Sequence, residues 1–154
     1  MIGYLMDTNH VSGLAVGRQS ISDKMKALPP NTQIYASTIT LGEIEAGHQM
    51  TVSTDQKKRN AVIAFINGTF VPNALSVSHS TGIYYGRIIG RIWRNSSPAN
   101  ASVSTDRHLV NLGVNVNDVW IVATAWEHGL TFLTNDKMEC IRNQVPEVVW
   151  DNWY

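Results

Sequence analysis

The alternation of short apolar segments with longer helical segments is the feature that most constrains how this chain folds. Apolar, β-prone runs occur at residues 2–6, 33–37, 130–134 and 148–150, and segments with helical spacing separate them. No two of these runs are joined by the short turn that makes a hairpin. Because parallel strands need helical crossovers, this order predicts an α/β fold with a mostly parallel sheet and helices on both faces.

Apolar spacing and end signals set the boundaries of the other elements. Helices are expected at residues 9–15, 21–28, 40–50, 55–67, 76–93 and 117–128. Pro29 stops the second of them and Gly129 the last. Residues 70–71 are expected to form a short strand before Pro72, and the polar residues 95–106 the longest loop.

Composition limits the classes of protein to which the chain can belong. Its 154 residues suffice for one substantial core, so a single domain over residues 1–154 is expected. Lys and Arg number 12 and Asp and Glu 12, which confines any nucleic-acid contact to a local site. The lone Cys140, the lack of a signal peptide and the lack of a long apolar run predict a cytoplasmic protein outside the membrane.

Four acids recur at equivalent places in this pattern. Asp7 directly follows the first predicted strand, and Asp136 follows the strand at 130–134 after one intervening residue. Glu43 and Asp118 lie at the starts of the two helices with the clearest boundaries. Because ligands of open α/β sheets bind outside the carboxyl ends of the strands, all four acids are expected at one rim of the sheet.

Each acid also has an explanation that involves no ligand. Glu43 completes a capping box with Thr40, and Asp118 complements the dipole of its helix. Asp136 can cap a short helix that follows it, and Asp7 can polarise the turn into the first helix. Four carboxylates at one rim would nevertheless repel one another unless a cation were present, and such oxygen ligands select Mg²⁺ or Mn²⁺.

Four sequence blocks, in order, carry a resemblance to a known family. They are Leu-Met-Asp-Thr-Asn at 5–9, Ser-Thr-Ile-Thr-Leu-Gly-Glu-Ile-Glu-Ala-Gly at 37–47, Asn-Asp-Val-Trp-Ile-Val-Ala-Thr-Ala at 117–125 and Leu-Thr-Phe-Leu-Thr-Asn-Asp at 130–136. With these blocks the chain resembles PIN-domain ribonucleases, and specifically the VapC-type toxins of bacterial toxin–antitoxin pairs. The resemblance implies a PIN-like fold and a metal-dependent endoribonuclease that leaves a 3′-hydroxyl and a 5′-phosphate.

The resemblance also implies roles for the four acids. Asp7 and Asp118 would be the main ligands of Mg²⁺, with Mn²⁺ as a substitute, and Asp136 a further ligand. Glu43 would orient the attacking water or help to hold a second ion. Glu45 is a rival for that role, but it points about 200° away from Glu43 on a helix, so the two cannot face one metal.

Further polar residues stand next to the acids in the sequence. Thr8, Asn9, Asn117 and Thr134 are expected to hold the carboxylates in place. Among the 5 histidines, which show no zinc-ligand spacing, His10 is the one worth testing because it adjoins the first block.

The resemblance implies partners as well. These are a cognate antitoxin, whose C-terminal segment would cover the acidic rim, an RNA such as a tRNA, and a second copy of the chain in a homodimer. A PIN nuclease of RNA maturation and a non-catalytic PIN domain that binds RNA or protein are the alternatives. A dehalogenase-like phosphatase is disfavoured, because Asn9 stands where its second aspartate is needed.

Three other segments have open interpretations. The basic residues 57–59, and the helix face formed by Arg87, Arg91 and Arg94, could contact RNA phosphates or simply be solvated. The aromatic segment 150–154 could dock on the core, support a dimer or contact the partner, with docking expected. Residues 95–116 form a longer lead-in to Asp118 than the family usually has.

Overall fold

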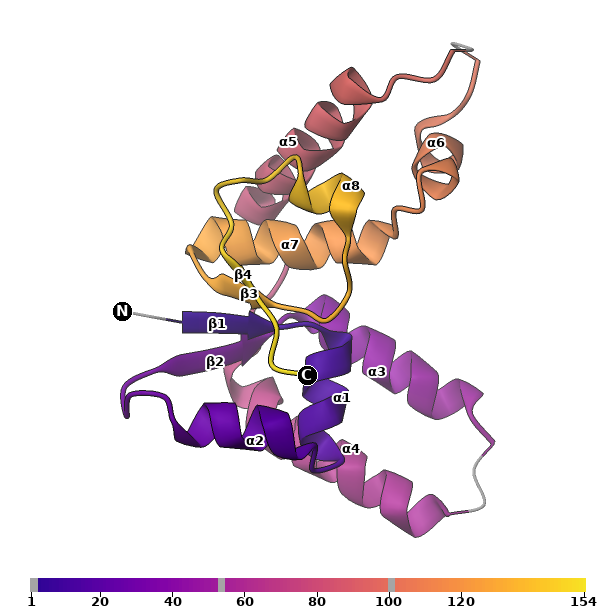
Figure 1. Cartoon of the computed structure of the whole chain (residues 1–154). Helices are drawn as coiled ribbons and strands as arrows, with labels where there is room; N and C mark the ends of the chain where they lie inside the picture. Colours follow the sequence, from indigo (N-terminus) through magenta and orange to yellow (C-terminus); the bar gives the residue numbers. More distant parts are fainter. Residues whose placement is uncertain (1–2, 53–54, 100–101) are drawn as a thin grey trace.

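A four-stranded parallel sheet lies at the centre of the molecule. The computed structural model describes residues 3–52, 55–99 and 102–154, so residue 2 of the first expected strand and residues 100–101 of the expected loop lie outside it. The strands are β1 (Gly3–Met6), β2 (Gln33–Ala36), β3 (Thr131–Leu133) and β4 (Trp150–Asp151). Their order is β2-β1-β3-β4, and each neighbouring pair is parallel (Figure 1). The parallel sheet predicted from the alternation is confirmed.

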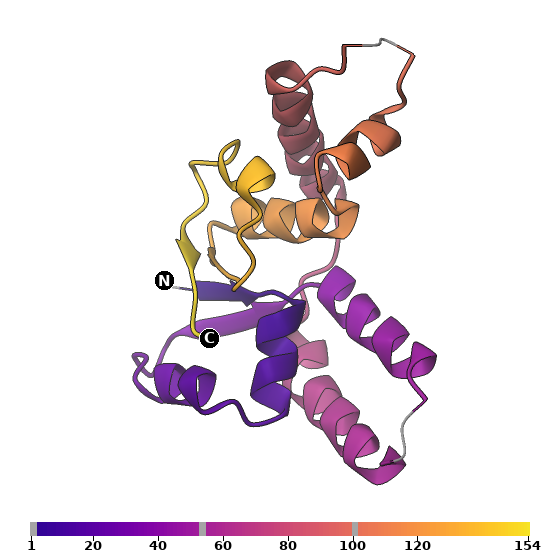
Figure 2. The same ribbon diagram turned by 45° about the vertical axis from the view of Figure 1, so that its right-hand side comes forward.

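Helices cover both faces of this sheet. They are α1 (Thr8–Ala15), α2 (Gln19–Lys26), α3 (Thr38–Met50), α4 (Gln56–Phe70), α5 (His79–Asn95), α6 (Thr105–Asn111), α7 (Val116–His128) and α8 (Glu139–Arg142). Helices α5, α7 and α8 lie on one side, and α1, α2 and α4 on the other (Figures 1 and 2). Within the described residues, no helix is long and apolar enough to cross a membrane.

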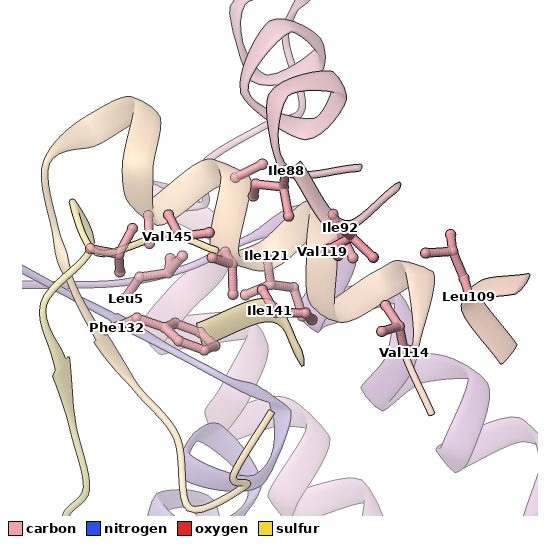
Figure 3. Close-up of a cluster of buried hydrophobic side chains, with 14 residues drawn as sticks. Leu5, Ile88, Ile92, Leu109, Val114, Val119, Ile121, Phe132, Ile141 and Val145 are labelled. Atoms are coloured by element: carbon pink, nitrogen blue, oxygen red, sulfur yellow. The ribbon is translucent and has the colours of Figure 1, made fainter. Parts of the chain in front are cut away.

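Alternation along the strands divides the core between the two faces. Leu5 and Phe132 point into a cluster with residues of α5, α7 and α8, which Figure 3 shows. Their neighbours Met6 and Leu133 point into a second cluster with residues of α1, α2 and α4. Successive strand residues face opposite sides, so one short strand serves both clusters. The segment at 150–154 docks on this second cluster through the buried Trp153, as expected.

Two expected elements are wrong. Residues 70–71 form no strand, because Phe70 is the last buried position of α4 and a 3₁₀ turn, Val71–Asn73, follows it. The end of the expected loop at 95–106 instead begins helix α6, where the Ser104 hydroxyl accepts a hydrogen bond from the Arg107 amide. Helices α5 and α6 extend together away from the sheet (Figures 1 and 2).

Candidate active site

One cavity at the carboxyl ends of β1 and β3 brings the four acids together. Asp7 follows β1, Asp136 follows β3, Glu43 lies in α3 and Asp118 in the first turn of α7. All four line a cavity of about 230 Å³. The other lining residues are Thr8, Asn9, Asn115, Ile121 and Met138. Segments more than a hundred residues apart in the chain therefore place carboxylates around one space.

Asp7 begins α1 as well as lining the cavity. The residue is only 3% exposed, and its Oδ1 accepts hydrogen bonds from the His10 amide, at 2.7 Å, and from the His10 ring nitrogen Nδ1, at 2.9 Å. The Asp7 amide donates to the carbonyl of Leu133 at 3.0 Å, which ties it to β3. One carboxylate oxygen is thus fixed by two donors.

Glu43 bonds across the cavity and not within its own helix. Its two carboxylate oxygens accept hydrogen bonds from the Thr8 hydroxyl and from Asn117 Nδ2, the latter at 2.8 Å. The expected capping box with Thr40 is wrong: Ser37 caps α3, and its hydroxyl accepts from the Thr40 amide at 3.0 Å. Because Ser37 and not Thr40 caps α3, Glu43 lies one turn further from the start of the helix than expected. There its side chain faces α1 and α7.

Glu45 takes no part in the cavity. Its carboxylate is exposed and accepts a hydrogen bond from Gln49 Nε2 at 2.6 Å along the surface of α3. The cavity is lined by Glu43 and not by Glu45.

Asp118 lies in the first turn of α7 and faces the other three acids. Burial, followed by the charges of Glu43, Asp136 and Asp7, raises the pKa of Asp118 from 3.8 to about 6. Within residues 3–52, 55–99 and 102–154, no side chain or amide donates a hydrogen bond to its carboxylate. Asp118 is a partly buried carboxylate among three others and has no donor of its own, so a cation near it would relieve the most repulsion.

Asp136 is held by a neighbouring amide. Asn9 Nδ2 donates to Asp136 Oδ2 at 3.1 Å and to Asn135 Oδ1 at 3.0 Å. The Asp136 amide donates to the hydroxyl of Thr134 at 3.0 Å, which shapes the turn after β3. The expectation that Asp136 caps the short helix is wrong, because Met138 occupies the cap position of α8 without a side-chain hydrogen bond. Asp136 is therefore directed to the cavity and not to a helix end.

The donor set of the cavity suits a hard divalent cation. Its ligands are carboxylate oxygens with amide and hydroxyl oxygens beside them, the chemistry that Mg²⁺ and Mn²⁺ prefer. In the conformation seen, no group of three or more His, Cys, Asp or Glu among the described residues is arranged to hold a metal ion. Amide and hydroxyl donors occupy Glu43 and Asp136 instead. The residues fit such a cation by chemistry and charge.

The three arginines singled out on α5 divide into two kinds. Arg91 is engaged, because its guanidinium pairs with both carboxylate oxygens of Glu147, at 2.7 and 2.9 Å, and lies over the ring of Trp126. Arg87 and Arg94 are exposed on α5. The helix face expected from spacing therefore presents two arginines to solvent, with the third tied to the segment after α8.

A second cavity adjoins the acid cluster. It has a volume of about 420 Å³ and shares Asp118 and Met138 with the first cavity. Lys137 and Cys140 are among its other lining residues. Space with mixed polar and apolar walls thus continues from the acids.

Comparison with solved structures shows which proteins share this fold. No protein-family model and no curated protein sequence matches the chain. A chain of VapBC2 from Rickettsia felis, bound to a DNA fragment from its promoter, is 18% identical with a TM-score of 0.73, covering 99% of this chain and 100% of that one. A chain of VapBC-1 from nontypeable Haemophilus influenzae is 22% identical, with a TM-score of 0.67 and coverage of 99% and 98%.

A third structure, VapBC-5 from Mycobacterium tuberculosis, is described as a member of the VapBC family of toxin–antitoxin systems. Its matching chain is 19% identical, with a TM-score of 0.62 and coverage of 99% of both chains. At these identities the likeness shows the fold. The PIN-like α/β fold expected from the four sequence blocks is confirmed.

Proposed function

We propose that this chain is the toxin of a type II toxin–antitoxin pair and acts as a Mg²⁺-dependent endoribonuclease. The observation that carries the proposal is the gathering of Asp7, Glu43, Asp118 and Asp136 around one cavity from four separate segments. The VapBC complexes that share the fold, one of them described as a toxin–antitoxin system, support the biological setting.

In this proposal Asp7, Asp118 and Asp136 hold the cation, with Mn²⁺ able to replace Mg²⁺. When bound, the cation supplies positive charge that activates a water and neutralises the charge developing on the phosphodiester. The phosphate of an accessible RNA segment would approach from the open side of the cavity. The adjoining cavity beside Asp118 offers room for the nucleotide next to that phosphate.

The remaining residues would set the positions of the reacting groups. Both oxygens of Glu43 are held, by Thr8 and by Asn117, so the carboxylate has a fixed direction in which to orient an attacking water. Asn9 fixes one oxygen of Asp136 in the same way. The supporting role proposed for these amides and hydroxyls is to keep the acids in place while RNA binds.

The proposed partners are a cognate antitoxin, RNA and a second copy of the chain. The antitoxin would place a C-terminal segment over the acidic rim and so block access to the four carboxylates. The toxin would form a homodimer and, with the antitoxin, a hetero-oligomer. A tRNA is the proposed target, since cleavage needs a single-stranded loop with an accessible backbone.

Cleavage of total cellular RNA by the purified protein, freed of any antitoxin, tests the proposal. Discrete fragments are expected with Mg²⁺ or Mn²⁺ and not with EDTA. The Asp7→Asn variant should yield none, although asparagine preserves the cap of α1. The matched control is Asp23→Asn, which changes an exposed carboxylate on α2 and should leave the fragments unchanged. Cleavage that persists in EDTA or in the Asp7→Asn variant would refute the proposal.

A further inference from the structure

His10 is a fully buried imidazole in contact with Asp7, and both of its ring nitrogens are engaged. The side chain is 0% exposed. Nδ1 lies 2.9 Å from Asp7 Oδ1, and Nε2 lies 3.1 Å from the backbone nitrogen of Trp153. The imidazole therefore connects the acid cluster to a residue 143 positions away in the chain.

The second contact determines which nitrogen carries the hydrogen. A backbone N–H can only donate, so Nε2 must be the acceptor and lacks a proton. The ring hydrogen is then on Nδ1, where it is donated to Asp7 Oδ1. The bond fixes the carboxylate without a positive charge that would compete with a cation for it.

The segment that supplies this amide is itself firmly held. Trp153 is buried and packs its ring against Tyr4, with centroids 5.0 Å apart. The rings of Tyr154 and His10 pack in a T-shaped arrangement with centroids 5.0 Å apart, and the Tyr154 hydroxyl donates to the Asn9 carbonyl at 2.7 Å. The imidazole is thus fixed on its far side and cannot turn away from Asp7.

The two oxygens of Asp7 have different surroundings as a result. Oδ1 accepts both hydrogen bonds from His10, one from its amide and one from its ring. Over the described parts of the chain, Oδ2 accepts none. One oxygen is anchored, and the other is left for a ligand of the cavity that Asp7 lines.

We propose that His10 is a positioning residue for Asp7: its Nδ1–H fixes Oδ1, so that Oδ2 is presented to the divalent cation. Residues 153 and 154 contribute by setting the tautomer and the orientation of the ring. The inference rests on the proposed function, because it takes Asp7 as a cation ligand. Donors that fix a ligand in this way are worth about 10- to 100-fold in metal affinity or activity.

Two substitutions separate the two contacts of the ring. In His10→Asn the amide nitrogen lies about where Nδ1 lies, so the donor to Asp7 is kept and the acceptor for Trp153 is lost. In His10→Gln the amide oxygen lies about where Nε2 lies, so the acceptor for Trp153 is kept and the donor to Asp7 is lost. The side-chain nitrogen of asparagine always carries hydrogens, whereas Nδ1 of histidine does so only in one tautomer. The asparagine variant can therefore donate to Asp7 without a contact to Trp153.

The measurement is Mn²⁺ binding by calorimetry, with thermal unfolding of each metal-free variant and RNA cleavage measured alongside. His10→Gln should raise the dissociation constant for Mn²⁺ by about 10-fold or more, and His10→Asn should stay within about threefold of wild type. The unfolding temperature should fall more in His10→Asn, because that variant loses the link to Trp153. The glutamine variant should therefore lose more Mn²⁺ affinity, and the asparagine variant should lose more thermal stability.

Equal Mn²⁺ affinities in the three proteins, or affinity losses that follow the unfolding temperatures, would overturn the inference. If wild type binds Mn²⁺ but cleaves no RNA, the proposed function fails, while the affinity ratio of the two variants still decides the role of His10. If wild type binds no Mn²⁺, the inference is overturned together with the cation site.

Discussion

The pKa of Asp118 reflects both the burial of this residue and the charges of the three acids around it. Burial, and then the three neighbouring carboxylates, raise its pKa from 3.8 to about 6 in the folded, metal-free protein. Between pH 4 and pH 6 the folded chain therefore holds a proton that the unfolded chain has lost. Stability falls as the pH rises through this interval, and the full penalty is present above about pH 6.

Asp118→Asn should remove this penalty. In EDTA at pH 7 we expect the variant to be more stable than wild type by about 1 kcal/mol, a value reduced for the partial exposure of the site. At pH 4 the folded state of both proteins is uncharged at this position, so the difference should be much smaller. Urea denaturation at the two pH values measures it. A gain that is equal at both pH values would contradict the charge explanation.

Glu43 and Glu45 provide a matched pair for testing the proposed reaction. Glu43 lines the cavity and is held by Thr8 and Asn117, whereas Glu45 is exposed and bonded to Gln49. Glu43→Gln should slow RNA cleavage by about 100-fold, the usual worth of a group that orients or deprotonates water. Glu45→Gln should leave the rate within about twofold. Equal effects of the two substitutions on initial rates would remove Glu43 from its assigned role.

At this scale the sequence predicted which acids lie together, and it predicted Thr8, Asn9 and Asn117 as neighbours that hold them, but it did not predict how Asp7 is held. Strand ends and helix starts are local patterns, and they placed Asp7, Glu43, Asp118 and Asp136 at one rim. The tautomer of His10 depends on an amide 143 residues away, for which no local pattern exists. The predicted capping box at Thr40 was wrong because Ser37, three residues earlier, also has a capping hydroxyl, and it accepts the hydrogen bond from the Thr40 amide.

Helix α3 carries Glu43 into the cavity, and its start depends on one buried hydroxyl. Ser37 is 0% exposed and accepts from the Thr40 amide at 3.0 Å. Ser37→Ala should therefore lower the free energy of unfolding by about 1 kcal/mol, the usual worth of a serine cap. Thr38→Ala is the control, because Thr38 is exposed and its backbone, not its side chain, bonds to Leu75. Urea denaturation of the two variants should separate them; equal losses would show that the cap is unimportant.

Elements with strong end signals were predictable, and those defined by tertiary contacts were not. Helix α7 ends at Gly129, whose left-handed φ of 62° explains why glycine stops it there. Helix α6 lies in a polar stretch with little apolar spacing, and its formation depends on Leu109, which is buried in the core that α5 and α7 share. Whether residues 105–111 form a helix is thus set by packing against distant segments and not by their local composition.

The order of the strands is the property of the whole molecule that creates the site. The alternation of strands and helices predicted a parallel sheet, but periodicity carries no information on which strands are neighbours. In the structure β1 pairs with β3, which brings the end of the first strand, with Asp7, beside the end of a strand that begins at Thr131. The four acids are therefore adjacent only when the entire chain is folded.

This dependence on the whole fold predicts that a divalent cation stabilises the protein globally. An unfolded chain has its acids at positions 7, 43, 118 and 136, too far apart in sequence to bind one ion together, so the cation binds the folded state alone. At a concentration about 100-fold above the dissociation constant, Mn²⁺ should add about 2.7 kcal/mol to the free energy of unfolding. Thermal denaturation in Mn²⁺ against EDTA at equal ionic strength measures the gain.

The gain from Mn²⁺ should be lost in Asp118→Asn and kept in Asp23→Asn, because only the first substitution removes a carboxylate from the cavity. A gain of the same size in Asp118→Asn would mean that the cation stabilises the fold from somewhere other than the acid cavity.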